Sequence, residues 1–222
     1  MKELQKHKRV NDILLGPLER PALGWLAAHM PAWVTPDSCT AIGILGAFVA
    51  AIGYGLSNYN PGFLWLASLG FVLNWFGDSL DGTLARYRRI ERPLYGYYID
   101  HTTDMVCQTT ILLGLGFSPY VSFNIACLLL IAYLLLSALV YLRTYVASEF
   151  KISYGGWGPT ESRVVAVLLN TAMYFFGLQN FKLFQATVSV YDIAIAGIAL
   201  VLFCFFVNTA TREARRLAAL GE

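Results

Sequence analysis

Four aspartates at helical spacing are the residues of this chain best suited to chemistry. Asp78 and Asp81 lie three positions apart, and Asp100 and Asp104 follow later with a spacing of four. On helices each pair shares one face, so the four carboxylates are expected to converge between two adjacent helices. Carboxylates gathered inside an apolar bundle repel one another unless a cation lies between them. Hard divalent ions take oxygen ligands and are often shared with substrate phosphates, so the pattern predicts a metal site that also binds phosphate.

Small and basic residues surround these aspartates. Gly82 and Gly96 leave out side chains where a bulky ligand needs to approach the helix backbones. Arg86 follows one turn after Gly82, and its guanidinium group suits phosphate oxygens. A single aspartate of this kind is most simply a solvated helix end. The four together, in register with two glycines and an arginine, indicate a binding site.

The composition indicates a membrane protein. Of the 222 residues, 57% are hydrophobic and only 14% are charged, and the mean hydropathy is +0.55. A soluble domain has nearer one quarter charged residues. The formal net charge of +2 excludes the strongly basic surface of a nucleic-acid binder, so we expect lipids or small anions as partners.

Apolar runs predict six transmembrane helices. The run 38–77 is broken at 57–62, the run 105–142 is broken at 116–120, and 164–181 and 190–211 supply two more helices. Each is close to the roughly 20 residues that cross a bilayer core. We therefore expect an all-α integral membrane protein with one domain over 1–222. An N-terminal amphipathic helix in 1–36 would lie in the interface, and 37–222 would form the six-helix bundle.

The distribution of charge predicts the orientation in the membrane. Of 16 basic residues, only Lys182 falls on the second side of these spans. Both termini and the aspartates are therefore expected on the cytoplasmic side. Two further sets of charges are expected to be ordinary flanking residues. These are the solvated, head-group-facing Arg88, Arg89 and Arg92, and the membrane anchors Arg143, Glu149, Lys151 and Arg163.

The aspartate pattern resembles a known signature. Asp-x-x-Asp-Gly-x-x-Ala-Arg, a short spacer and Gly-x-x-x-Asp-x-x-x-Asp are similar to the motif of the CDP-alcohol phosphotransferase family. The resemblance implies transfer of a phosphoryl-linked group from a CDP-activated donor to an alcohol, with release of CMP. It implies Mg²⁺ or Mn²⁺, as two ions, held by Asp78, Asp81, Asp100 and Asp104. The nucleotide and diphosphate would contact Gly82, Ala85, Arg86 and Gly96.

The start of the first predicted span also bears on nucleotide binding. The family often carries Pro-Asn there with a nearby Ser or Thr, and this chain has Pro36, Asp37 and Thr40. Asp37 and Thr40 are therefore candidate nucleotide contacts, although Asp37 departs from the usual asparagine.

Two residues narrow the branch of the family. His101 directly follows Asp100, and residues 158–161 read Gly-Pro-Thr-Glu. Both features look like the cholinephosphotransferase and ethanolaminephosphotransferase branch, in which a His and a Glu are associated with activating the lipid hydroxyl. A neutral imidazole oriented by a carboxylate is a good base near neutral pH, so His101 is the candidate base, with Glu161 assisting and Asp104 as the alternative base. Structural roles stay open: His101 as an interfacial polar residue and Glu161 as a charge at a helix N-terminus.

The expected reaction moves a head group from CDP-choline or CDP-ethanolamine to a lipid hydroxyl such as that of diacylglycerol. The alternative is phosphatidyl transfer from CDP-diacylglycerol to glycerol phosphate, inositol phosphate or serine, which uses the same metal and CMP site. A transporter is the more distant alternative, since acidic residues also mark ion pathways, although these usually lie near mid-membrane. The head group, the acceptor lipid and the preferred metal are not determined by the sequence.

The resemblance also implies a homodimer among membrane lipids. Small residues recur every fourth position along the first predicted span, at Gly43, Ala47 and Ala51. Such a stripe permits close helix packing, either within the bundle or between two copies.

Overall fold

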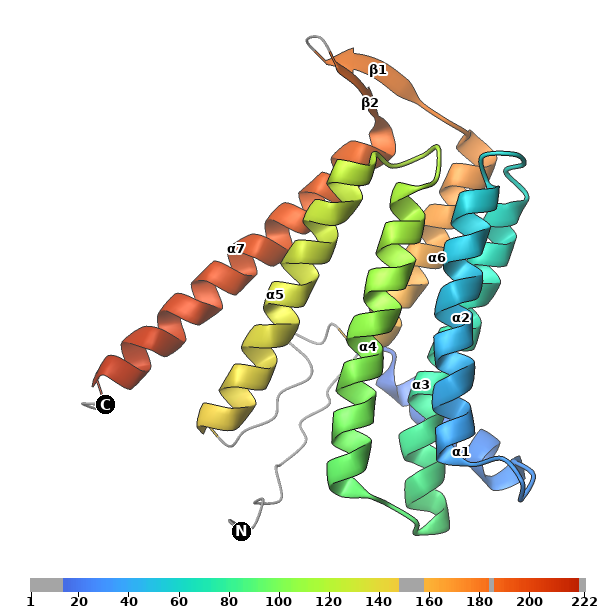
Figure 1. Ribbon diagram of the computed structural model, residues 1–222, viewed down its shortest axis with the longest axis vertical. Helices are drawn as coiled ribbons and strands as arrows, with labels where there is room; N and C mark the ends of the chain where they lie inside the picture. The colour runs from blue at the N-terminus through green and yellow to red at the C-terminus, as the bar shows by residue number, and fades with distance from the viewer. Residues whose placement is uncertain (1–13, 148–157, 184–185, 220–222) are drawn as a thin grey trace.

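The computed structural model describes residues 14–147, 158–183 and 186–219, and these form seven helices and one antiparallel hairpin (Figure 1). The basic residues at 2–9, Glu149 and Lys151 lie outside the described residues. In chain order the elements are α1 Gly16–His29, α2 Pro36–Leu56, α3 Phe63–Arg88, α4 Pro93–Gly116, α5 Phe123–Ala147, α6 Pro159–Phe176, β1 Asn180–Leu183, β2 Ala186–Ser189 and α7 Val190–Ala219.

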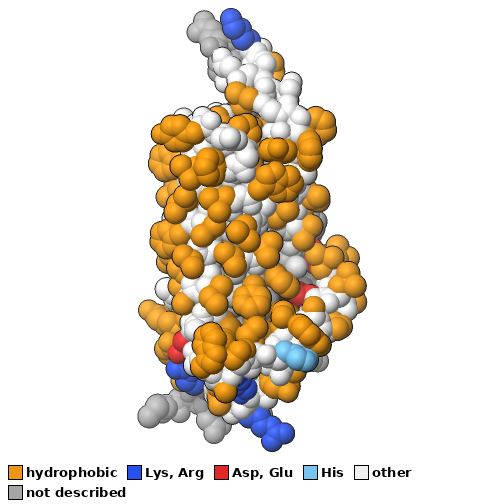
Figure 2. Space-filling view, turned by 90° about the vertical axis from the view of Figure 1, so that its right-hand side faces the viewer, with side chains coloured by type: hydrophobic (Ala, Val, Ile, Leu, Met, Phe, Trp, Pro, Cys, Tyr) orange, Lys and Arg blue, Asp and Glu red, His pale blue; other side chains and the backbone are white. Residues whose placement is uncertain are grey.

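The helical architecture agrees with a multi-pass membrane protein. Within the described residues, four helices, namely α2, α3, α5 and α7, are long and apolar enough to cross a bilayer. Helices α4 and α6 run alongside them, and the hairpin extends beyond one end of the bundle (Figure 1). On the face in Figure 2, hydrophobic side chains cover most of the height, and Lys and Arg gather mainly at the end opposite the hairpin.

The β-hairpin shows that the predicted end of the fifth apolar helix, at residue 181, is wrong. The apolar run was expected to stay helical to residue 181, but α6 ends at Phe176 because Gly177 adopts a positive φ of 63°. Strands β1 and β2 then pair from Asn180 to Ser189. The apolar pattern alone did not separate this short β-ribbon from the end of a helix.

Helices α2 and α3 cross at very short range because glycines leave no side chains between them. A Cβ atom placed on Gly77 would lie 2.2 Å from the backbone nitrogen of Gly43, and one on Gly46 would lie 2.4 Å from the nitrogen of Asn74. The small-residue stripe therefore packs within the chain: Gly43 and Gly46 lie against α3, and Ala51 lies against Gly114 of α4. Of the two uses expected for this stripe, the structure shows the one within the bundle.

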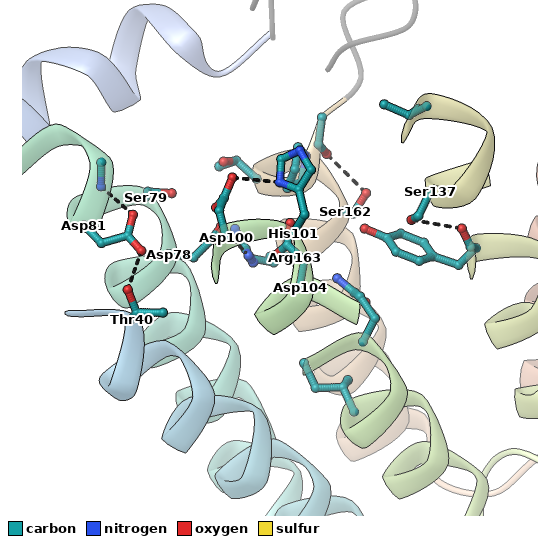
Figure 3. A pocket seen from close by; sticks show the side chains of 18 of the residues that line it. Thr40, Asp78, Ser79, Asp81, Asp100, His101, Asp104, Ser137, Ser162 and Arg163 are labelled. Carbon is teal, nitrogen blue, oxygen red and sulfur yellow. Dashed lines mark hydrogen bonds and ion pairs between the residues drawn. The ribbon is translucent and has the colours of Figure 1, made fainter. Parts of the chain in front are cut away.

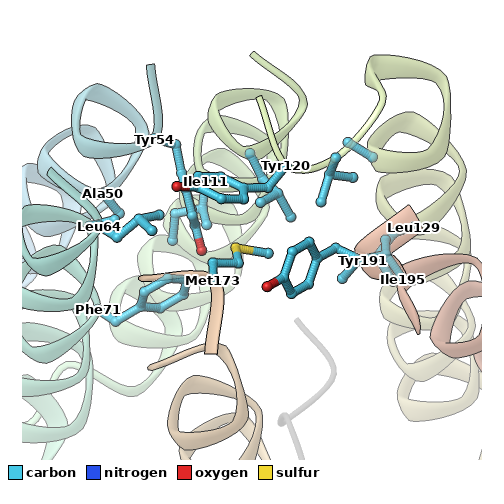
Figure 4. Packing of buried hydrophobic residues seen from close by; sticks show 14 of the residues in the cluster. Ala50, Tyr54, Leu64, Phe71, Ile111, Tyr120, Leu129, Met173, Tyr191 and Ile195 are labelled. Carbon is cyan, nitrogen blue, oxygen red and sulfur yellow. The ribbon is translucent and has the colours of Figure 1, made fainter. Parts of the chain in front are cut away.

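The main core lies toward the hairpin end of the bundle, where α2 ends and α3 and α7 begin. Figure 4 shows how its side chains pack. Tyr54 of α2 packs with Phe71 of α3, and Tyr120 packs edge-on with Tyr191 of α7. The Tyr54 hydroxyl also donates to Asn170 of α6, which is 1% exposed. At this end these contacts join α2 to α3 and α6, and join α7 to the α4–α5 connection. Toward the opposite end, α5 and α7 diverge from α4 and α6 (Figure 1).

Helix α1 packs across that opposite end. Leu23 and Ala27 form a second core cluster with Cys39, Leu80 and Leu84. The α1–α2 connection is held by Arg88, which donates hydrogen bonds to backbone carbonyl oxygens between Met30 and Val34. The expectation of a solvated Arg88 is therefore wrong: its five N–H donors match a turn whose carbonyls have no helical partners.

Candidate active site

Three carboxylates converge between α3 and α4. Asp78, Asp100 and Asp104 each offer one oxygen, and these oxygens lie within 4.8 Å of one another. All three side chains are partly buried, so their mutual repulsion is only incompletely screened by water. The donor set is entirely hard oxygen, which fits Mg²⁺ or Mn²⁺ better than a soft metal.

Asp81 lies in the same cavity but outside this group of three. Its carboxylate accepts a hydrogen bond of 2.7 Å from the Thr40 hydroxyl and another from the backbone N–H of Gly82 (Figure 3). The close α2–α3 crossing produces this contact, because it brings the start of α2 against the end of α3. Two predicted site residues, Thr40 and Asp81, are thus brought together directly.

An arginine completes the carboxylate cluster. Arg163 of α6 donates from Nη2 to Asp78 at 2.7 Å and from Nε to Asn74 at 2.9 Å. Its side chain is only 8% exposed. The expectation that Arg163 is a membrane-flanking anchor is therefore wrong. One signal was available in the sequence: an arginine just inside an apolar helix requires a buried partner.

His101 lies beside the cluster, between two tyrosines. Its Nδ1 atom is 3.1 Å from Asp100 Oδ2, and its ring packs against Tyr97 and Tyr141 with centroids 4.1 and 4.9 Å away. A carboxylate can only accept this hydrogen bond, so Nδ1 carries the proton. The neutral ring then has its lone pair on Nε2, the atom that can receive a proton.

Glu161 is directed elsewhere. One carboxylate oxygen accepts the backbone N–H of Leu15, at the start of α1, and the other accepts that of Gly158, at 2.8 and 2.9 Å. Among the described residues, its neighbours Thr160 and Ser162 line the cavity and Glu161 does not. The structure therefore joins Glu161 to the α1–α6 junction.

Glu19, which the sequence did not single out, closes the same junction from α1. Its Oε1 atom accepts hydrogen bonds from Trp75 and Ser79 of α3 and from Thr160 of α6. Ser79 adjoins Asp78 in the chain, so α1 is anchored one residue from the carboxylate cluster. The available signal was a charged pair, Glu19 and Arg20, within a largely apolar segment.

The remaining predicted residues line the same cavity. These are Asp37, Gly82, Ala85, Arg86 and Gly96. The Arg86 guanidinium lies over Gly82, since a Cβ there would be 3.2 Å from its Nη1. Asp37 forms an ion pair with Arg92, whose guanidinium also lies 4.1 Å from the centre of the Tyr95 ring. Arg92 thus lines the cavity and pairs with Asp37, so it is not purely head-group-facing as expected.

The cavity combines a polar end with an apolar wall. Its volume is about 2930 Å³, and it extends from the carboxylates into the space that α4, α5, α6 and α7 enclose. The apolar wall includes Leu129, Leu136, Leu169, Ile198 and Phe205. An amphiphilic molecule can therefore place a polar group at the carboxylates and its hydrocarbon along this wall.

Comparison with known proteins gives a consistent result. The family model for CDP-alcohol phosphatidyltransferase matches residues 33–206. Cholinephosphotransferase 1 of Gallus gallus is 26% identical over 191 residues, which cover 80% of this chain and 55% of that protein. Phosphatidylinositol phosphate synthase of Cutibacterium acnes is 33% identical over 106 residues, covering 45% of this chain and 49% of that protein. Archaetidylinositol phosphate synthase of Pyrococcus horikoshii is 31% identical over 116 residues, covering 52% of this chain and 56% of that protein. The chain spans about half the length of these curated relatives.

Proposed function

The chain belongs to the CDP-alcohol phosphatidyltransferase family, and we propose that it moves a phospho-alcohol head group from a CDP-alcohol to a lipid hydroxyl. CDP-choline or CDP-ethanolamine is the donor, diacylglycerol is the acceptor, and CMP is released. The observation that carries this proposal is the position of His101, which lines a cavity shared by the carboxylates and an apolar wall. A lipid hydroxyl at the carboxylates would lie near this imidazole while its chains occupy the apolar part.

Asp78, Asp100 and Asp104 would hold the divalent metal, and Asp81 would join them as the fourth ligand. We expect two ions, Mg²⁺ or Mn²⁺. When bound, such ions neutralise the diphosphate and the charge that develops on the leaving CMP. The half-buried carboxylates supply the negative charge that this arrangement needs.

The nucleotide side of the cavity is assigned to the residues around Arg86. Its guanidinium would bind the diphosphate oxygens, and Gly82, Ala85 and Gly96 would leave room for them. Asp37 and Thr40, at the start of α2, would contact the nucleoside. Both residues line the cavity, and the ion pair of Asp37 with Arg92 restricts the Asp37 side chain there, which supports this placement.

In the proposed reaction, the acceptor oxygen attacks the phosphorus that carries the head group. A new P–O bond forms, and the P–O bond to CMP breaks. His101 takes the hydroxyl proton at Nε2 while Asp100 holds the ring through Nδ1, an arrangement suited to general-base catalysis. Asp104 is the alternative base, but a carboxylate bound to a divalent ion is a poorer one.

Glu161 is assigned a positioning role. Its two hydrogen bonds fix the start of α6 to the start of α1, and Thr160, Ser162 and Arg163 of the same turn line the cavity. We expect Glu161 to act through that turn rather than on the acceptor itself.

The membrane arrangement is part of the same proposal. Helices α4 and α6 would cross together with the four longer apolar helices, giving six spans in a single domain over 1–222. Helix α1 would lie in the interface with Leu18 and Trp25, which are 74% and 61% exposed, toward the lipid. The described Arg residues sit at the carboxylate end of the helices, which supports a cytoplasmic active site and cytoplasmic termini. The protein would act as a homodimer.

A second candidate is phosphatidyl transfer from CDP-diacylglycerol to a small polar alcohol. The relatives named as inositol phosphate lipid synthases favour it, since they match this chain at 33% and 31% identity. The metal and CMP site would be the same in both reactions.

Release of CMP tests the enzyme class. Purified protein with Mg²⁺ should release CMP from a CDP-alcohol only when a lipid acceptor is present, and Asp100→Asn should abolish that release. Release that is unaffected by Asp100→Asn would contradict the proposed site.

A further inference from the structure

Arg163 is bound at two corners of its guanidinium group by two residues of α3. Its Nη2 atom donates to Asp78 Oδ2 at 2.7 Å, and its Nε atom donates to Asn74 Oδ1 at 2.9 Å. Asn74 and Asp78 are one helical turn apart in α3, so the planar group spans that turn from α6. The contact with Asn74 is buried, and the contact with Asp78 is partly buried, since the Asp78 side chain is 22% exposed.

Asn74 is itself fixed by the backbone of α2. Its Nδ2 atom donates to the carbonyl oxygen of Gly43 at 3.0 Å. The close glycine contacts between α2 and α3 leave this carbonyl little freedom. A continuous series of hydrogen bonds thus extends from Gly43 through Asn74 and Arg163 to Asp78, and joins α2, α3 and α6.

A membrane anchor would not need this burial. Removing an arginine from water is expensive, and the protein recovers the cost only through well-placed partners. In return, Arg163 bonds Oδ2 of Asp78 and so restricts the orientation of that carboxylate. Partners of this kind orient carboxylate ligands and commonly change metal affinity by about 10- to 100-fold when removed.

We propose that Arg163 is a positioning residue of the metal centre, which fixes the Asp78 carboxylate so that it faces the ion together with Asp100 and Asp104. The inference rests on the metal centre of the proposed function. It concerns how one ligand is held, and it applies whichever donor the enzyme uses.

Charge alone predicts the opposite effect on metal binding. Three ionised carboxylates carry −3, and Arg163 reduces the local charge to −2. If Arg163 acted only through its charge, its removal would make the site more negative and tighten the binding of a cation. If it positions Asp78, its removal weakens binding in spite of that gain.

Direct titration of Mn²⁺ distinguishes these two roles without any substrate. Mn²⁺ binding to the purified protein in detergent is measured calorimetrically for the wild type, Arg163→Gln and Arg163→Lys. We expect both variants to bind about 10- to 100-fold more weakly, because lysine keeps the charge but cannot contact Asn74 and Asp78 together. Arg143→Gln is the matched control: Arg143 pairs with Glu213 of α7 at 3.4 Å, and its loss should leave Mn²⁺ affinity unchanged.

The other outcomes of the Mn²⁺ titration overturn either the inference or the metal centre on which it rests. Wild-type or tighter Mn²⁺ binding by Arg163→Gln overturns the inference and leaves the proposed function intact. Absence of Mn²⁺ binding by the wild type overturns the metal centre itself, and the inference with it. Thermal unfolding in a metal chelator tests folding separately. If neither Arg163 variant folds, the residue is structural and the positioning role is overturned.

Discussion

Replacing Gly77 with alanine should separate α2 from α3 and disable the carboxylate cluster. The new Cβ would lie 2.2 Å from the Gly43 nitrogen and 2.4 Å from the Cys39 carbonyl oxygen, whereas ordinary contacts begin at 3.4 Å. The shortfall is 3.4 minus 2.2, or 1.2 Å, and both neighbouring atoms belong to backbone. The two helices must therefore move, because no side chain can rotate away.

This movement has two measurable consequences. Overpacking of this kind typically costs about 1–3 kcal/mol of stability. Asp78 is the next residue, so it would shift against Arg163 by a comparable distance, and a displacement of about 1 Å in a catalytic group can reduce the rate about 100-fold. Unfolding monitored by tryptophan fluorescence in detergent measures the first effect, and CMP release measures the second.

Gly55→Ala is the matched control. Gly55 also lies in α2, and a Cβ there meets nothing within 4 Å. We expect its stability and activity to stay close to those of the wild type. If Gly77→Ala matched Gly55→Ala in both measurements, the close crossing would not be what positions the site.

Further substitutions test individual residues of the site. Asp81→Asn and Asp100→Asn should each abolish turnover, because each removes an anionic metal ligand; near-normal turnover in a folded variant would refute that assignment. His101→Ala should lower kcat by about 10²- to 10⁴-fold with little change in Mn²⁺ affinity, whereas wild-type turnover beside an inactive Asp104→Asn that still binds metal would make Asp104 the base. Glu161→Gln should lower the free energy of unfolding by about 1–3 kcal/mol, since one backbone amide loses its acceptor, and should reduce kcat less than His101→Ala does. A loss of kcat as large as that of His101→Ala, at unchanged stability, would assign Glu161 to proton transfer.

Of the four aspartates expected to converge, three do so and Asp81 instead bonds to Thr40, and the part that was predicted has largely local determinants. Asp78 with Asp81, and Asp100 with Asp104, lie at i+3 and i+4 spacing, and that spacing fixes a shared helix face once the segment is helical. The apolar runs likewise predicted helical segments, since their length is set by the bilayer. Three of these aspartates do converge.

The parts that depend on distant contacts could not be predicted in this way. Arg163 is 85 positions from Asp78, so its ion pair depends on how α6 packs against α3. Glu161 was expected beside His101, yet its partner Leu15 lies 146 positions away and is brought near by the docking of α1. From its neighbours in the sequence, Arg88 is expected to be a solvated charge. The carbonyl oxygens that it binds come together only when the α1–α2 connection folds.

The identity of the donor that yields product lipid tests the central proposal most directly. Purified protein with Mg²⁺ is supplied in parallel with radiolabelled CDP-choline or CDP-ethanolamine plus diacylglycerol, and with radiolabelled CDP-diacylglycerol plus inositol phosphate, glycerol phosphate or serine. The proposal predicts labelled phospholipid from a CDP-alcohol with diacylglycerol, and its loss in His101→Ala. Labelled lipid formed only from CDP-diacylglycerol would contradict it and establish the opposite direction of transfer.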